Sequence, residues 1–108
     1  MFVLSQGKSG KQHFNLLARN KRVILTSEAY ESRASALKGI ASVRKNAGKR
    51  EQFEIRTARN GRRYFVLLAP NGEIIGQSQM YAAPSGAYTG IRSVMRNGPT
   101  AELGDDGA

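Results

Sequence analysis

The chain has 108 residues, no cysteine, one histidine, and 17 Lys and Arg against eight Asp and Glu, which gives a formal net charge of +9. This length fits one domain rather than a multidomain enzyme, and the composition excludes disulfides, a thiol nucleophile and a thiolate zinc site. Since neither a membrane-spanning run nor a signal peptide is evident, we expect a cytoplasmic protein that contacts no membrane, holds no metal or other cofactor, and is not an enzyme.

The first 27 residues alternate apolar and polar side chains in three short stretches, which indicates three strands. Turn-forming residues separate these stretches. The expected order is a strand at 2–5, a turn at Ser9-Gly10, a strand that places Phe14, Leu16 and Ala18 on one face, a turn at Asn20-Lys21, and a strand at 22–27.

Beyond a short link that contains Tyr30, the apolar period changes to that of a helix with one buried stripe. Ser32 is the expected N-cap of this helix, and Asn46 stands where a left-handed C-cap residue belongs. Residues 49–57 then read as one long strand that closes the first unit and opens a second one. The residues of the buried stripe are Ala36, Ile40 and Val43.

The same order of elements repeats after 51 residues. Positions 2–46 align with 53–97 without a gap, and 16 of these 45 pairs are identical, against about three expected by chance. In the second half we expect a type I′ turn at Asn60-Gly61, Pro84 in the first turn of the helix, and a left-handed cap at Asn97. The chain is therefore a duplication of a β-β-β-α unit.

One such unit buries too little surface to be stable alone, so the two units are expected to share a sheet. The predicted fold class is α+β: two tandem β-β-β-α(-β) repeats share one antiparallel sheet, with two helices packed on one face and a pseudo-two-fold relation. We expect a single domain at 1–103, built of repeats 1–50 and 51–103, with 100–103 as a closing strand and a disordered acidic tail at 104–108. Fusion of two units favours a monomer.

A resemblance to the YegP-like family of small bacterial proteins of unknown function, in its tandem two-repeat form, rests on two runs, FNLLARNKRVILTSEAYESRASALKGIASVRKNA and YFVLLAPNGEIIGQSQMYAAPSGAYTGIRSVMRNG. It covers positions 2–98, and Lys21 departs from it by replacing the usual turn glycine. The resemblance implies two β(3)-α-β units in one antiparallel sheet, with terminal strands exchanged between the units. It implies no activity, cofactor or catalytic residue.

Ser27 and Tyr30, together with their equivalents Ser78 and Tyr81, are polar residues that both halves share. Hydroxyl groups at these strand-to-helix corners could bind a small molecule or serve an enzyme. We favour a structural interpretation, in which Ser satisfies backbone groups and Tyr closes the end of the core. The single histidine, His13, has no matching imidazole in the second half, so no catalytic residue is predicted.

Gly39 and Gly90 occupy the middle of the two predicted helices. Glycine there costs about 1 kcal/mol relative to alanine. Its occurrence in both halves indicates that each helix approaches the sheet or the other helix closely.

Charge is the remaining functional signal, and it is uneven. Residues 1–50 carry 11 basic and two acidic side chains, whereas residues 51–108 carry six of each. Clustered Lys and Arg neutralise phosphates, so we expect weak, sequence-independent binding of nucleic acid or another polyanion. The alternative is a basic surface that only aids solubility. The candidate contacts are Arg33, Lys38, Arg44, Lys45, Lys49 and Arg50.

The sheet face opposite the helices is a possible site for a protein partner. Strand alternation places polar, aromatic and apolar side chains on it together, which suits a partner protein or stacked bases. Alternatively, exchanged strands or a second copy of the protein cover this face. The residues expected there are His13, Asn15, Leu17, Tyr64, Val66 and Leu68.

Overall fold

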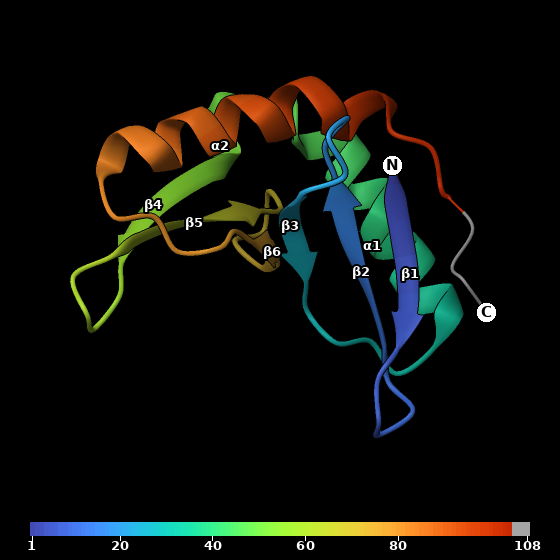
Figure 1. Ribbon diagram of the computed structural model, residues 1–108. Helices are drawn as coiled ribbons and strands as arrows, with labels where there is room; N and C mark the ends of the chain where they lie inside the picture. The colour runs from blue at the N-terminus through green and yellow to red at the C-terminus, as the bar shows by residue number, and fades with distance from the viewer. Residues whose placement is uncertain (105–108) are drawn as a thin grey trace.

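The computed structural model describes residues 1–104, so most of the expected acidic tail lies outside the described residues. Each half forms three strands and then a helix, and the whole is an α+β fold as predicted (Figure 1). The elements are β1 (Phe2–Gln6), β2 (Gln12–Leu17), β3 (Val23–Ser27), α1 (Arg33–Asn46), β4 (Phe53–Thr57), β5 (Arg63–Leu68), β6 (Ile74–Gln77) and α2 (Pro84–Asn97), with 3-10 turns at Arg50–Gln52 and Gly98–Thr100.

The strands form one antiparallel sheet in the order β1-β2-β3-β6-β5-β4. The two halves join at its centre, where Thr26 pairs with Gln77 and Ser27 with Gly76. Leu25 and Gly76 are equivalent positions of the two repeats, and they meet at this seam. A Cβ on Gly76 would come within 2.9 Å of Cγ of Leu25, so the symmetric junction has room for only one of the two side chains.

Both helices cover the same face of the sheet, and each crosses the seam. α1 contacts β2 of its own half and also β5 and β6, while α2 contacts β5 and β3. The sheet-facing stripe of each helix is buried as predicted. Below it, Phe2 packs edge-on against Phe14 with ring centres 5.7 Å apart, and Phe53 packs against Phe65 at 5.8 Å.

The helix N-termini match the sequence-based expectations. Ser32 Oγ accepts a hydrogen bond from the backbone N of Ser35 (3.1 Å), so Ser32 is the N-cap of α1. Pro84 is the first residue of α2, where its missing N–H leaves no helical hydrogen bond unmade.

The predicted left-handed C-caps at Asn46 and Asn97 are wrong. Neither residue has a positive φ, because both still belong to their helices. Each side chain instead reaches back one turn. Nδ2 of Asn46 donates to the carbonyl oxygen of Ser42 (2.9 Å), and Nδ2 of Asn97 donates to that of Ser93 (2.8 Å).

The turn at Asn60-Gly61 is also not the predicted type I′ turn. Gly61 has a φ of +82°, but Asn60 does not adopt a positive φ. Gly61 N donates to the carbonyl oxygen of Ala58 (3.0 Å), and Asn60 Oδ1 accepts from the N of Arg62 (3.0 Å). The asparagine is therefore selected for its side-chain hydrogen bond, and only the glycine for its conformation.

The segment between α1 and β4 is not one long strand. Residues Arg50–Gln52 form a 3-10 turn, and β4 starts at Phe53 and pairs with β5 at one edge of the sheet. This segment therefore opens the second unit without closing the first one.

The C-terminal segment does cross to the other unit, so the strand exchange implied by the resemblance is one-sided. Phe2 N donates to the carbonyl oxygen of Glu102 (2.8 Å), and Gly104 N donates to that of Phe2 (2.7 Å). The segment expected to close the second unit thus runs parallel to the start of β1 and covers the edge of the first unit.

Candidate nucleic-acid interface

The two serine corners are built into the backbone network. Ser27 Oγ accepts a hydrogen bond from the N of Phe14 (2.9 Å) and donates one to the carbonyl oxygen of Glu28 (2.7 Å). Ser78 Oγ makes the same two bonds in the second half, at the same distances. Since each hydroxyl already satisfies two backbone groups, the geometry supports the structural interpretation of Ser27 and Ser78.

The two tyrosines fill the space between sheet and helix. Tyr30 stacks on Phe14 with ring centres 6.1 Å apart, and the same arrangement recurs around Tyr81. A Cβ on Gly39 would lie 2.7 Å from Cζ of Tyr30, and Gly90 is equally crowded by Tyr81. The mid-helix glycines therefore allow close approach as predicted, and the neighbour they approach is a tyrosine ring.

A groove of about 380 Å³ lies beside the second corner and is the space that a small molecule could enter there. The groove is lined by Ile24, Tyr81, Ser85, Gly86, Thr89, Gly90 and Ser93, and it does not include Ser78. The structure therefore does not combine Ser78 and Tyr81 into one accessible site.

At the first corner, burial raises the pKa of the Tyr30 hydroxyl, and the carboxylates of Glu28 and Glu73 raise it further.

Arg44 serves as an anchor for the C-terminal segment. Its Nε donates to the carbonyl oxygen of Ala101 (3.0 Å), and its guanidinium lies 5.3 Å from the centre of the Phe2 ring. Among the six candidate contact residues predicted from the sequence, Arg44 is therefore the one whose side chain holds a distant segment of the chain in place.

Three of the predicted lysines are free to meet a ligand. Lys38, Lys45 and Lys49 are exposed, and within residues 1–104 their side chains have no hydrogen-bond or ion-pair partner. Lys38 and Lys45 are seven residues apart, so they share the outer face of α1. Arg33 is exposed at the first residue of α1, about 18 Å along the helix from Lys45, since each residue adds 1.5 Å.

Arg50 links the predicted residues to α2. Its Nη1 donates to the carbonyl oxygen of Phe53 (3.3 Å), and its guanidinium lies 5.8 Å from the centre of the Tyr88 ring. Tyr88 is 49% exposed, which is high for an aromatic side chain. Arg92 and Arg96 follow it at intervals of one helical turn, and both are exposed.

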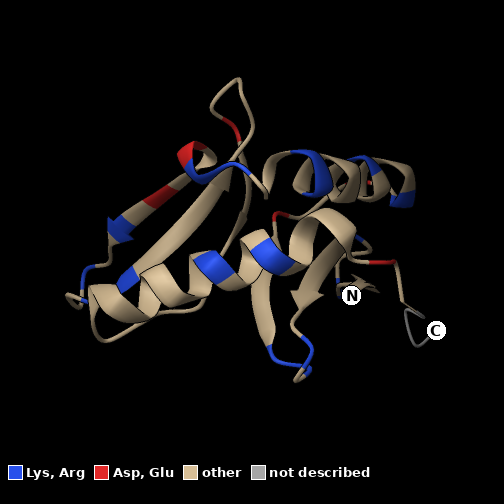
Figure 2. Cartoon of the chain, turned by 90° about the horizontal axis from the view of Figure 1, so that it is seen from above, with Lys and Arg blue, Asp and Glu red and all other residues tan. Residues whose placement is uncertain are grey.

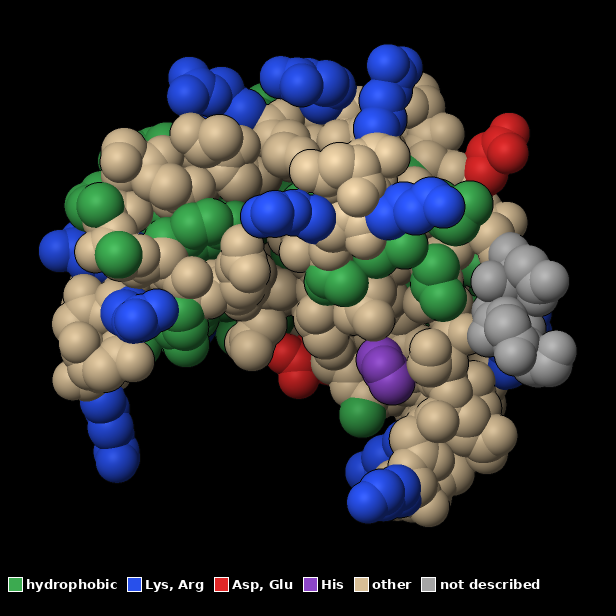
Figure 3. All heavy atoms as spheres, viewed as in Figure 1, with side chains coloured by type: hydrophobic (Ala, Val, Ile, Leu, Met, Phe, Trp, Pro, Cys, Tyr) green, Lys and Arg blue, Asp and Glu red, His purple; other side chains and the backbone are tan. Residues whose placement is uncertain are grey.

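The helix layer as a whole carries only positive charge. The two helices contain six of the 17 Lys and Arg residues and none of the eight Asp and Glu residues. From above, Figure 2 shows basic segments on both helices and on the link before β4. Figure 3 shows Lys and Arg side chains gathered along the upper part of the molecule. The basic residues of the helices are Arg33, Lys38, Arg44, Lys45, Arg92 and Arg96.

The C-terminal ends of the two helices converge, which brings these charges together. A Cβ on Gly98 would lie 2.7 Å from Cβ of Ala47, so the residues after the two helices touch. The last turns carry Arg44 and Lys45 on α1 and Arg96 on α2. The basic surface is therefore made by both repeats.

Sequence reasoning missed Tyr88, Arg92 and Arg96. A net charge calculated for each half of the sequence does not reveal these arginines, because the acidic residues of the second half cancel their charge in the sum. Those acidic residues lie outside α2. Placing the predicted second helix on a helical wheel, where Arg92 and Arg96 fall opposite the apolar stripe, would have found both.

The open sheet face is partly filled by its own side chains. Val66 is fully buried, and His13, Leu17, Tyr64 and Leu68 are half-buried. The side chain of Asn15, also half-buried, accepts a hydrogen bond from Oγ1 of Thr26 (2.9 Å). A protein partner on this face stays a prediction.

No group of three or more His, Asp or Glu side chains in residues 1–104 could hold a metal ion. Neither helix in this range is long and apolar enough to cross a membrane.

Comparison with known proteins finds relatives of similar length. A family model described as a domain of unknown function, DUF1508, matches residues 8–54 and again residues 58–105. A UPF0339 protein of Pseudomonas aeruginosa is 50% identical over 105 residues, which are 97% of this chain and 96% of that protein.

Two solved structures have the same fold. The solution NMR structure of Escherichia coli YegP, a protein of unknown function, matches with a TM-score of 0.91 and 48% identity, over 97% of this chain and 90% of that chain. A UPF0339 protein of Shewanella oneidensis matches with a TM-score of 0.89 and 40% identity, over 96% and 88% of the two chains. These findings confirm the predicted duplication and the resemblance to YegP.

Proposed function

The chain belongs to the DUF1508 family of proteins of unknown function, and from its own surface we propose that it binds nucleic acid without sequence specificity through the outer face of its two helices. The observation that carries this proposal is the charge of the helix layer, which holds six cations and no carboxylate. The binding face, called the helix surface below, consists of Lys38, Lys45, Lys49, Arg50, Tyr88, Arg92 and Arg96.

The spacing of the cations suits a phosphate backbone. Lys38 and Lys45 lie two helical turns apart, about 10 Å, and Arg92 and Arg96 lie one turn apart, about 6 Å, as the helical rise requires. Long Lys and Arg side chains can adjust their end groups over several ångströms, so they can meet successive phosphates. Such contacts release counterions and carry no sequence information.

The Arg50–Tyr88 pair adds an aromatic element to this charged face. The guanidinium lies against the tyrosine ring, and about half of the tyrosine is exposed. An exposed ring beside cations is the combination that single-stranded nucleic acid uses, because bases stack on the ring while phosphates meet the charges. We therefore expect single strands to bind more tightly than duplexes.

The proposal is tested with the triple variant Lys38→Gln, Lys45→Gln and Arg92→Gln. The measurement is the fluorescence anisotropy of labelled single-stranded and duplex DNA and RNA, titrated with protein between about 50 and 200 mM salt, the range in which phosphate contacts weaken strongly. Since each lost phosphate contact reduces the magnitude of the slope of log K against log salt by about 0.7 to 0.9, we expect the three substitutions to reduce it by about two to three.

The control removes the same number of charges elsewhere. Lys8, Arg59 and Arg62 lie on the hairpin turns β1–β2 and β4–β5, and in residues 1–104 their side chains have no hydrogen-bond or ion-pair partner. The variant with Gln at these three positions should keep the original salt slope. Equal weakening by both triple variants would show that only net charge matters and would remove the proposed surface, as would absence of binding at low salt.

A further inference from the structure

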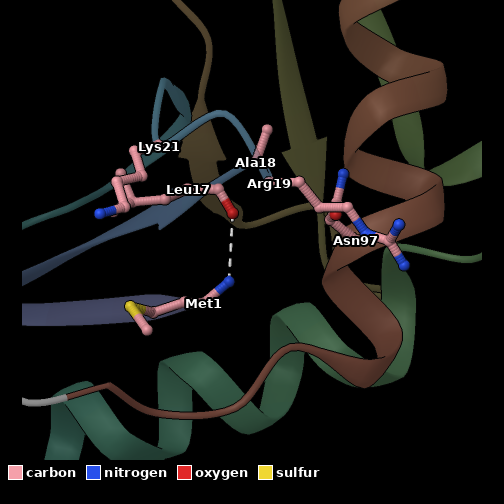
Figure 4. Close-up of a pocket in the computed structure, with 6 residues that line it drawn as sticks. All are labelled: Met1, Leu17, Ala18, Arg19, Lys21 and Asn97. Atoms are coloured by element: carbon pink, nitrogen blue, oxygen red, sulfur yellow. Dashed lines mark hydrogen bonds between the residues drawn. The ribbon is translucent and has the colours of Figure 1, made fainter.

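A depression lies between the β2–β3 turn and the C-terminal end of α2, and it consists of two adjoining pockets. The larger has a volume of about 490 Å³ and includes the apolar side chains of Met1 and Leu17 (Figure 4). The smaller has a volume of about 260 Å³ and is lined mainly by polar side chains, Arg96 among them. Ala18, Arg19 and Asn97 line both pockets. Together the two pockets have the size of a small-molecule site.

The charged side chains that line the depression are all cations. Arg19 stands at the boundary of the two pockets, Lys21 lines the larger one, and Arg96 lines the smaller one. Within residues 1–104 none of these three side chains has a hydrogen-bond or ion-pair partner. In Figure 4, the Arg19 side chain extends toward Asn97 at the end of α2, and Lys21 lies on the opposite side of the pocket. An anion placed here meets no competing carboxylate from the pocket lining.

The duplication supplies an internal comparison for this site. In the other half, the side chain of Gln52 donates to the carbonyl oxygen of Leu68 (2.7 Å). The N of Met1 donates to the equivalent oxygen, that of Leu17 (3.1 Å). Asn46, the equivalent of Asn97, is only 2% exposed. The equivalent asparagine is therefore buried in one half, whereas Asn97 is half-buried and lines both pockets in the other.

The turns beside these two equivalent positions also differ in sequence between the halves. Pro70 and Gly72 of the β5–β6 turn are replaced by Arg19 and Lys21 in the β2–β3 turn. Lys21 adopts a φ of +68°, a left-handed conformation that strains the backbone of a non-glycine residue. The β5–β6 turn has neither these two cations nor a non-glycine residue with a positive φ. Strain at a ligand-facing residue is typical of binding sites.

We propose that this depression binds a phosphate monoester that carries an apolar or aromatic group. The phosphate lies between Arg19 and Arg96, where guanidinium groups can bind its oxygens in pairs. The apolar group lies against Met1, Leu17 and Ala18. The site shares Arg96 with the helix surface, but Lys38, Lys45 and Arg92 do not line either pocket, so the two proposals can be tested with different variants.

The test is a titration of the full-length, ¹⁵N-labelled protein with phenyl phosphate, followed by the amide shifts in NMR spectra. We expect saturable shifts confined to residues 17–21 and 93–97, and at least fivefold weaker binding of inorganic phosphate, which lacks the apolar group. The double variant Arg19→Pro and Arg96→Gln should lose at least tenfold in affinity. Its proline is the residue of the equivalent turn, so the fold should be kept, and an unchanged spectrum elsewhere verifies this.

The control is the helix-surface triple variant, which removes three charges outside the depression and should keep the affinity within twofold. Equal affinity for phenyl phosphate and inorganic phosphate, shifts spread over the whole basic surface, or equal losses in the double and triple variants would each overturn the proposal.

A dinucleotide with and without a 5′-phosphate distinguishes the two possible sources of the bound phosphate group, the end of a nucleic acid and a free small molecule. Tighter binding of the phosphorylated dinucleotide than of phenyl phosphate indicates nucleic-acid ends, and the reverse order indicates a free small molecule. In both cases the dinucleotide without the 5′-phosphate should bind more weakly than the one with it, and equal binding of the two would overturn the proposal.

Discussion

Single side chains with two backbone partners hold the strand-to-helix corners. In each half one serine hydroxyl accepts from the amide of a core phenylalanine and donates to the carbonyl of the next residue. Ser78 is more buried than its equivalent in the first half. Ser78 is 7% exposed, whereas Ser27 is half-buried. Water can therefore replace the hydroxyl of Ser27 more easily than that of Ser78.

The first prediction compares the two serines. Ser78→Ala leaves the amide of Phe65 buried without an acceptor, which costs about 1 to 3 kcal/mol. Ser27→Ala should cost less, because its amide partner can reach water. Chemical denaturation of both variants measures the difference, and an equal or reversed order would contradict the burial argument.

The second prediction concerns the mid-helix glycines. Gly→Ala in a helix normally stabilises by up to about 1 kcal/mol, but at Gly39 and Gly90 the new methyl group would overlap a tyrosine ring. Overpacking of this kind costs about 1 to 3 kcal/mol, so we expect Gly39→Ala and Gly90→Ala to lower the free energy of unfolding. Gly48→Ala is the control, since its Cβ would meet only Pro99, at 3.6 Å. A stabilised Gly39→Ala variant would refute the close approach.

At the scale of elements, the two halves differ most at their ends. By the repeat offset, Leu103 is equivalent to Gln52, which directly precedes β4 along the chain. The C-terminal segment, in contrast, precedes no strand within the described residues and lies beside β1 of the first half, where Leu103 forms a parallel bridge with Phe2. Arg44 holds it there through the carbonyl of Ala101.

The third prediction tests this anchor. Arg44→Gln removes the hydrogen bond to Ala101 and the contact with Phe2, so the C-terminal segment should open more often while the sheet stays intact. Hydrogen exchange should show the amides of Phe2 and Gly104 exchanging about tenfold faster, which corresponds to about 1.4 kcal/mol of local stability. Lys45→Gln, which removes a neighbouring charge without a partner, should leave both rates unchanged. Equal rates in the two variants would show that Arg44 is not the anchor.

At the scale of the whole molecule, the hydrophobic core belongs to neither half alone. Each helix packs on strands of both repeats, and the sheet is continuous across the seam. A fragment with one repeat would expose the apolar surface that the other repeat covers. The single domain at 1–103 and the monomeric state stay predictions.

The fourth prediction follows from this shared core. A fragment of residues 1–50 should be largely unfolded by circular dichroism and NMR, because half of the core cannot offset its chain entropy. The full chain should unfold in one transition, with the same midpoint by circular dichroism and by tyrosine fluorescence. A folded fragment, or two separated transitions, would show two independent domains.

The sequence by itself determined the duplication, the order of strands and helix in each half and the buried stripe around Ile40 and Ile91, but not the break between α1 and β4. Those features depend on periodicity and on residues a few positions apart, which a sequence displays directly. It misassigned Asn46, Asn97 and Asn60, because an asparagine at a helix end or turn can act through its conformation or through its side chain, and the two uses have the same pattern.

Only the tertiary structure decided which charges meet. Arg44 looked like a free cation in the sequence, yet its partner Ala101 lies 57 positions away. Arg19 and Arg96 line one pocket only because the β2–β3 turn of one repeat reaches the helix of the other. Electrostatic and pocket geometry depend on distances in space between segments remote in sequence, and local pattern carries no information about those distances.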